Sequence, residues 1–437
     1  MGAALAAALL VLAAALVGTA VQHADGTLFV NWPPLLATWA PHVGPGTPVA
    51  IVVALVVVAY GPAVAARLPW RALLGTAWAS AVVWTFGLAL IDGWGRGIAR
   101  KLTTRYEYLQ VIDRFDDIPG TLRDFTHHIL LDSPGHWPPH VAGHPPASTL
   151  TFVLLDRIGL GGGAWAGVWC IAVGGTACVA VLVTVRLLAG EALARRAAPF
   201  LVLAPSAVWA GTSADGYFAA VAAWALALLA LAVTGHAPRT CATAAGLLFG
   251  LTFYLSYGLT LVVVIAAAVL VLGRDGPRPR ARPLPLLLCG LAGLAVVPTV
   301  FTLAGFDWWE AYRLLVTRYR QGAGGVRPYG YWVWANLACT VLMTGLATAA
   351  GVRRAAVSLR APHDPHDRRL ALLVVAALLA LLIADLSGMS KAETERIWLP
   401  FAVWLLPAGA FLSAPRAWLA AQAVLALLVN HLLLTGW

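Results

Sequence analysis

The sequence predicts an all-α polytopic membrane protein with about 13 transmembrane helices. Hydrophobic residues make up 60% of its 437 residues and charged residues only 11%, whereas a soluble globular protein carries about 25% charged residues. Apolar runs of about 20 residues, the length that crosses a bilayer, recur along the whole chain. Because lipid offers no hydrogen bonds to the backbone, each segment must satisfy its own amides, which favours helices over a barrel.

The first apolar run also has features of a signal peptide, because it ends in small residues. However, no basic residue precedes it and the first charge is Asp25, so we expect it to be retained as a span. The linkers are too short for a separate soluble domain, and one membrane domain is expected. The expected spans are residues 3–21, 49–66, 72–92, 164–186, 197–212, 216–234, 240–255, 257–273, 284–304, 332–351, 370–386, 397–413 and 416–435.

The charges of the short loops indicate the orientation, because Arg and Lys concentrate on the cytoplasmic side. The loops 67–71, 186–196, 273–282 and 353–369 are rich in arginine and fall on one side of these spans. If that side is the cytoplasm, it holds 16 basic and 4 acidic residues, and the outside holds 13 basic and 15 acidic residues. The net charge of +10 therefore indicates topology and contact with anionic lipid, with no nucleic-acid partner.

The segment 147–160 is apolar but too short for a span, and Asp156 and Arg157 interrupt it. Counting it as a span would place the later arginine-rich loops outside. We therefore expect a helix that lies on the outer membrane surface, within an extracytoplasmic loop over residues 93–163.

Acidic and aromatic residues gather on the predicted outer face, and ionisable residues at span ends often mark a substrate path or a catalytic centre. The alternative is hydrated loops with interfacial Trp and Tyr. Asp92 ends the third span, either in a site or as an ordinary helix-end charge. Asp215 follows Ser213 before the sixth span, where both residues could also cap the next helix.

Two motifs in the outer loops suggest metal ligands weakly. Asp116 and Asp117 form a carboxylate pair that suits a divalent cation, although such pairs are common. His136, His140 and His144 are spaced by four, but the prolines between them rule out one helix face, and the spacing does not supply a fixed zinc geometry. The HPP sequence at 144–146 instead predicts a stiff bend that delivers His144 to a fixed place.

The segment KAETER (391–396) precedes a late apolar span. On a helix, Lys391 and Glu395 would form a pair four residues apart. A cation here could bind an anionic phosphate. The alternative is a solvated helix start.

Taken in order, these motifs resemble the GT-C superfamily of membrane glycosyltransferases, nearest to its protein-mannosyltransferase, aminoarabinose-transferase and actinobacterial envelope branches. The motifs are ALIDG ending at Gly93, RYEYL (105–109), HPPASTLTFVLLDRIGL (144–160), LAPSAVWAGTSADGYF (203–218) and KAETERIWLPF (391–401). The likeness covers roughly residues 72–415. It places the two spans of residues 1–71 outside a GT-C-like membrane domain of residues 72–437.

The resemblance implies transfer of a sugar from a polyprenyl-phosphate donor to the hydroxyl of a glycan, lipid or protein acceptor. The reaction would take place outside a bacterial plasma membrane, in cell-envelope glycan or glycoconjugate synthesis. It implies Asp92 as the general base, with Asp215 as a second, acceptor-positioning carboxylate. Because no second acid follows Asp92 directly, Glu107 stays open as the base. The substrate-binding residues that it implies are His144, Tyr106, Lys391, Glu393 and Arg396.

No cofactor is firmly implied, and the need for a divalent cation stays open. The chain lacks the phosphate-loop motif G-x-x-x-x-G-K-[ST], so a directly bound nucleotide is not expected. Two other function classes remain: a transporter or flippase of lipid-linked sugars, and a non-catalytic membrane scaffold with the same fold. Transporters often contain internal repeats and charges at mid-membrane, and neither is evident here.

Overall fold

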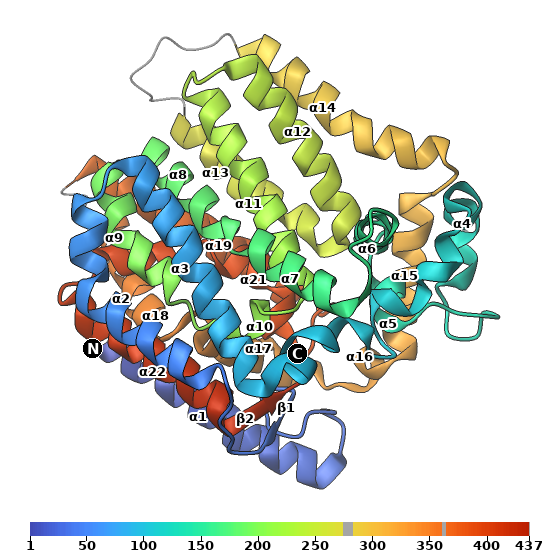
Figure 1. Ribbon diagram of the computed structural model, residues 1–437, viewed down its shortest axis with the longest axis horizontal. Helices are drawn as coiled ribbons and strands as arrows, with labels where there is room; N and C mark the ends of the chain where they lie inside the picture. The colour runs from blue at the N-terminus through green and yellow to red at the C-terminus, as the bar shows by residue number, and fades with distance from the viewer. Residues whose placement is uncertain (274–282, 361–363, 437) are drawn as a thin grey trace.

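The computed structural model describes residues 1–273, 283–360 and 364–436, which are helical almost throughout (Figure 1). Among these residues, seven helices are long and apolar enough to cross a membrane, or eight if one bent pair counts as a span. The predicted class, an all-α polytopic membrane protein, is confirmed, whereas the count of 13 spans is not. The seven are α1 (Gly2–Asp25), α2 (Thr47–Arg67), α3 (Trp70–Ala89, extended to Asp92 by a 3-10 turn), α7 with α8 (Gly162–Gly174 and Thr176–Ala189), α11 (Ala214–Val233), α14 (Pro283–Leu303) and α19 (Pro365–Leu386).

Three of the expected spans are interrupted. The run 332–351 becomes α17 (Tyr329–Thr344) and α18 (Leu346–Arg360), bent by 106° at Gly345, whose φ of 87° suits glycine. The run 397–413 divides into α20 (Thr394–Ile397), α21 (Leu399–Ala402) and the 3-10 helix η7 (Leu406–Phe411), the last two beginning near prolines. The run 197–212 contains the end of α9 (Glu191–Val202) and a separate turn, α10 (Ala207–Ala210).

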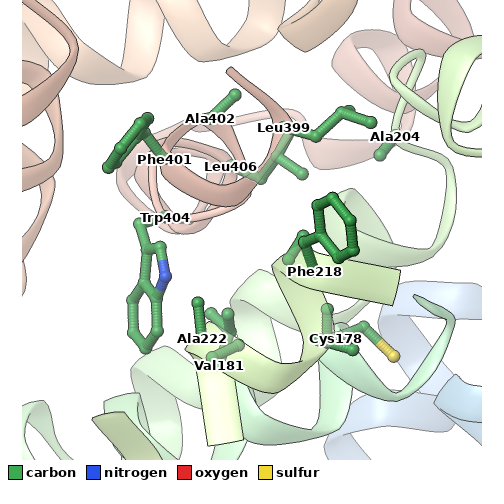
Figure 2. Packing of buried hydrophobic residues seen from close by; sticks show 14 of the residues in the cluster. Cys178, Val181, Ala204, Phe218, Ala222, Leu399, Phe401, Ala402, Trp404 and Leu406 are labelled. Atoms are coloured by element: carbon green, nitrogen blue, oxygen red, sulfur yellow. The ribbon is translucent and has the colours of Figure 1, made fainter. Parts of the chain in front are cut away.

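The core is built around α11, which packs against α8, α12 (Pro238–Leu255) and α13 (Val262–Gly273). Figure 2 shows Phe218 and Ala222 of α11 facing Cys178 and Val181 of α8, with Leu399 of α21 above them. Many of these buried residues are alanines, and small side chains let neighbouring helices approach closely.

The segment after α1 pairs with the C-terminal end of the chain. Strand β1 (Ala37–Trp39) pairs antiparallel with β2 (Leu433–Thr435), which follows the last helix, α22 (Pro415–Leu432). Helix α1 packs on α17 and α18, and α2 packs on α3, α9 and α22. The N-terminal segment is therefore an integral part of the bundle.

The loop 93–163 is folded into short helices rather than extended. Residues 118–143 lie beside α15 (Trp308–Gln321) at one side of the molecule (Figure 1), and α16 (Ala323–Val326) packs on α15, whereas residues 95–103 pack on α7. Arg318 of α15 donates to the carbonyl of Trp137 at 3.2 Å, which fastens the two segments together. A helix forms within the expected segment 147–160 as α6, more than half of whose residues are buried, and its place at the membrane surface stays a prediction. The elements of the loop are η2 (Gly95–Ala99), η3 (Lys101–Thr103), η4 (Tyr108–Phe115), α4 (Ile118–Asp124), η5 (Phe125–His128), α5 (Pro139–Gly143) and α6 (Ala147–Arg157).

Candidate active site

A small polar pocket lies where the loop 93–163, the start of α11 and the turn α20 meet. Its volume is about 10 Å³, roughly the space one water molecule requires. These segments are far apart in the sequence, yet they bring two cations and one carboxylate to the same point. The residues that line the pocket are Lys101, Glu107, Tyr108, Thr212, Ser213, Ala214 and Arg396.

Glu107 supplies the carboxylate that lines the pocket. It precedes η4 and is only 4% exposed. Its Oε1 lies 2.9 Å from Nδ1 of His140, which α5 presents. Its Oε2 is buried and has no hydrogen-bond partner among the described residues. Because an unsatisfied buried oxygen is unfavourable, this atom is suited to accept a hydrogen bond from a ligand.

Arg396 forms a buried ion pair with Asp215 across the pocket. The hydroxyl of Ser213 caps α11 by accepting from the Asp215 amide at 3.1 Å, and it also donates to Asp215 Oδ2 at 3.1 Å. The same Oδ2 accepts a hydrogen bond from Arg396 Nη1. Arg396 Nη2 lies 3.4 Å from Nε2 of His140. Asp215 and Glu107 are thus linked through Arg396 and His140.

Lys101 is the second cation in the pocket. Burial lowers the pKa of its ammonium to about 8, against the opposing influence of the Asp92 and Glu107 carboxylates. Its side chain makes no hydrogen bond to any residue that the structure describes. An ammonium in this state can bind an anion without first breaking an internal bond.

His144 enters the site through the predicted bend. Its backbone is extended, and Pro145 and Pro146 then lead into α6. Nδ1 lies 2.7 Å from the His140 carbonyl and 3.1 Å from the Tyr108 hydroxyl. Since a carbonyl only accepts, Nδ1 carries the proton and Nε2 keeps a lone pair. Burial lowers the pKa of His144 to about 4, so the ring is a neutral acceptor at neutral pH.

Asp92, the base implied by the resemblance, does not line this pocket. Its Oδ1 is paired with Nε2 of His42 at 2.9 Å, and its Oδ2 accepts from Nε of Arg96 at 3.2 Å. Arg96 also donates to the Thr435 carbonyl at 3.1 Å. The carboxylate therefore ties the N-terminal loop and strand β2 to the end of α3.

Two of the implied substrate-binding residues also lie elsewhere. Tyr106 is 42% exposed with Arg105 over its ring, and Tyr108, two residues later, takes the buried position. Lys391 donates to the Gly324 carbonyl at 3.0 Å. The expected Lys391–Glu395 helical pair is wrong, because Ala392 and the next residue adopt φ values of 67° and 61° and the helix begins only at Thr394.

Glu393 lies next to the pocket, between two arginines. Its Oε2 is 3.6 Å from Arg396 Nη2, and its Oε1 is 3.3 Å from Arg327 Nη2. Of the predicted residues, the structure thus brings together Glu107, Asp215, His144, Glu393 and Arg396.

Sequence reasoning missed Lys101, Tyr108 and His140 as members of the site. Lys101 is one of only two lysines in the chain, a signal that could have drawn attention to it. Of the carboxylate pair at 116–117, Asp117 has a structural role, because it caps α4 by accepting from the Gly120 amide at 3.1 Å. In the part of the chain that the structure describes, no group of three or more His, Cys, Asp or Glu residues is arranged to hold a metal ion.

Comparison with known proteins gives similarities to solved structures only, since no protein-family model and no curated protein matches the chain. One similar structure is the apo oligosaccharyltransferase of Archaeoglobus fulgidus, with a TM-score of 0.47 and 14% identity over 78% of this chain and 50% of that one. The same protein, AglB, in complex with an inhibitory peptide and a dolichol-phosphate gives a TM-score of 0.45 and 14% identity over the same shares. Apo ArnT from Cupriavidus metallidurans gives 0.43 and 15% identity over 73% of this chain and 56% of that one.

The chain thus spans about half the length of the proteins that it matches.

Proposed function

We propose that the chain transfers a sugar from a polyprenyl-phosphate donor to an acceptor hydroxyl at this pocket, on the extracytoplasmic side of the membrane. The observation that carries the proposal is the buried Oε2 of Glu107. It has no hydrogen-bond partner in the described part of the chain and belongs to a residue that lines a pocket with Lys101 and Arg396. A carboxylate can take the proton of the incoming hydroxyl, and two cations can neutralise a departing phosphate.

In this reaction the acceptor oxygen forms a bond to the anomeric carbon of the sugar while the bond from that carbon to the phosphate oxygen breaks. Glu107 receives the acceptor proton, and the polyprenyl phosphate leaves against Lys101 and Arg396. Asp215 orients the guanidinium of Arg396. The lone pair on Nε2 of His144 can accept a hydrogen bond from a sugar or acceptor hydroxyl.

An apolar cavity beside the pocket supports an amphiphilic donor. It has a volume of about 70 Å³ and is lined mainly by apolar residues from α3, α7, α8, α9, α10, α11 and α21. The two spaces are neighbours along the chain at the start of α11. Ala210 and Gly216 line the apolar cavity, and Thr212 and Ala214, each two residues away, line the polar pocket. An anionic head group in the polar pocket would therefore have apolar surface directly next to it.

The test is an assay of the purified protein in lipid vesicles with radiolabelled polyprenyl-phosphate sugars. We expect transfer by the wild type and a loss of at least about 100-fold in Arg396→Gln, a variant that cannot neutralise the phosphate. Arg320→Gln, at an exposed position of α15, is the matched control and should keep wild-type activity.

Each alternative function predicts a different result. Absence of transfer with any donor, together with movement of labelled lipid across the vesicles, would favour a transporter. Absence of both would favour a non-catalytic scaffold.

A further inference from the structure

Two arginines, Arg327 and Arg396, share the carboxylate of Glu393. Arg327 Nη1 and Nη2 donate to Glu393 Oε1 at 3.4 and 3.3 Å. The other oxygen, Oε2, lies 3.6 Å from Arg396 Nη2. Glu393 is three residues before Arg396 and belongs to the same turn. One carboxylate charge is therefore divided between an arginine of the pocket and an arginine outside it.

Arg327 is fixed in place by backbone carbonyls as well as by Glu393. It follows α16 and is 8% exposed. Its Nε donates to the Leu28 carbonyl at 3.0 Å, and its Nη1 donates to the Lys391 carbonyl at 2.7 Å. Because the guanidinium is a rigid planar fork, these two bonds set its direction toward Glu393. Leu28 follows the end of α1, so the N-terminal helix takes part in holding Arg327.

The backbone around Glu393 is also held in an unusual conformation. Ala392 and Glu393 have φ values of 67° and 61°, in the left-handed region that side chains disfavour. Such a conformation persists only where the surroundings impose it. Here Lys391 is tied on both sides, since its amide donates to the Tyr319 hydroxyl at 3.1 Å and its ammonium donates to the Gly324 carbonyl.

We infer that Arg327 is a positioning residue for Arg396, acting through Glu393. Arg327 takes part of the negative charge of Glu393, so that Arg396 stays on Asp215 and in the pocket. Without Arg327, the full carboxylate charge would act on Arg396 from within its own turn. It would draw the guanidinium away from the place where the phosphate binds. This inference rests on the proposed function, because it names the residue that keeps the phosphate-binding arginine in position.

The inference makes a prediction about coupling between two residues. We would measure the Kd of geranylgeranyl phosphate for the protein in detergent, and KM and kcat for transfer. Arg327→Gln should weaken binding about tenfold and raise KM with little change in kcat, a size within the usual range for contacting charges. Glu393→Gln should bind at least as tightly as the wild type. The double variant should match Glu393→Gln alone, because Arg327 has nothing left to shield.

Two further variants separate positioning from structure. Arg327→Lys keeps a positive charge beside Glu393 and should recover most of the affinity. If Arg327→Gln does not fold, the same cycle is run with Arg327→Lys, whose smaller loss should also disappear in Glu393→Gln. Glu393→Gly removes the carboxylate but accepts the left-handed backbone freely, and it should behave like Glu393→Gln.

The results that overturn the inference differ from those that overturn the proposed function. An equal loss of affinity on changing Arg327 in the presence and absence of Glu393 would show a purely structural role for Arg327. Wild-type binding that is lost in Arg396→Gln but unaffected by Arg327→Gln would also overturn the inference, while leaving the proposed function intact. No binding by the wild type, or binding that Arg396→Gln leaves unchanged, would overturn the proposed function itself.

Discussion

The identity of the catalytic base is the most direct point to test, and Glu107→Gln is the informative change. The substitution keeps the size of the side chain and leaves an oxygen that can accept from His140 Nδ1, which now lies 2.9 Å from Oε1. The fold should therefore change little. The amide cannot take a proton from the acceptor, and loss of a general base lowers turnover by about 10² to 10⁴. This corresponds to roughly 3–5 kcal/mol in the activation barrier.

Asp92→Asn is the matched comparison, because the resemblance implied that residue as the base. Its two carboxylate oxygens are already engaged by His42 and Arg96. An asparagine keeps one acceptor and loses the other, so we expect a stability loss of about 2 kcal/mol. Transfer by the folded fraction should stay within about threefold of the wild type, because the residue does not line the pocket.

The assay is single-turnover transfer from a radiolabelled polyprenyl-phosphate sugar, with the folded fraction and donor binding measured in parallel. The reasoning is refuted if Asp92→Asn loses transfer by 100-fold while folded and donor-bound. It is equally refuted if Glu107→Gln keeps a third or more of the wild-type rate. The first result would make Asp92 the proton acceptor, and the second would make Asp215 the next carboxylate to test.

Three further predictions concern charge and packing. With a pKa of about 8, Lys101 loses its proton as the pH rises through that value, so the affinity for polyprenyl phosphate should fall there. Lys101→Arg should keep its affinity up to about pH 10, because arginine stays charged. Polyprenyl phosphate binding measured at a series of pH values checks both. Burial raises the pKa of Glu395 to about 7. The neutral carboxyl therefore contributes its full stability at a pH below the ordinary pKa of glutamate, and this contribution is lost as the pH rises through 7. Denaturant unfolding should show the free energy of unfolding fall by roughly 3 kcal/mol over this range, and Glu395→Gln should not show the fall. A Cβ at Gly246 of α12 would lie 2.0 Å from the Gly290 carbonyl of α14, so Gly246→Ala should lower Tm by several degrees, whereas Gly75→Ala on α3, which has open space around it, should not.

The helices that could be predicted from the sequence are those in which one apolar run forms one straight helix. α11 is the clearest case, since the expected span 216–234 lies almost entirely within Ala214–Val233. The bend at Gly345 could not be predicted in the same way. At the bend, the side chain of Gln422 from α22 lies 2.8 Å from the position that a Cβ of Gly345 would occupy. Hydropathy along one segment carries no information about such a distant neighbour.

The site was partly predictable because some of its residues sit at element ends that sequence patterns mark. Ser213 was expected as a cap, and it does cap α11 and orient Asp215. The inward position of Tyr108 rather than Tyr106 depends on how η4 begins after Glu107, and no simple periodicity marks it. Lys391 does not line the pocket, because the two residues after it are left-handed and the helix begins only at Thr394. Treating the whole segment 391–396 as one helix cannot predict this.

The place of the N-terminal segment in the site follows from contacts that no local pattern could reveal. The resemblance begins at about residue 72, yet two residues before that point hold charged groups next to the pocket. His42 pairs with Asp92, and the Leu28 carbonyl accepts from Arg327, which in turn holds Glu393. The Asp92 carboxylate acts on the charge of Lys101, and Arg327 shares Glu393 with Arg396. The charges of the pocket are therefore set partly from outside the region of resemblance, and we propose that the first 71 residues belong to the machinery of the site.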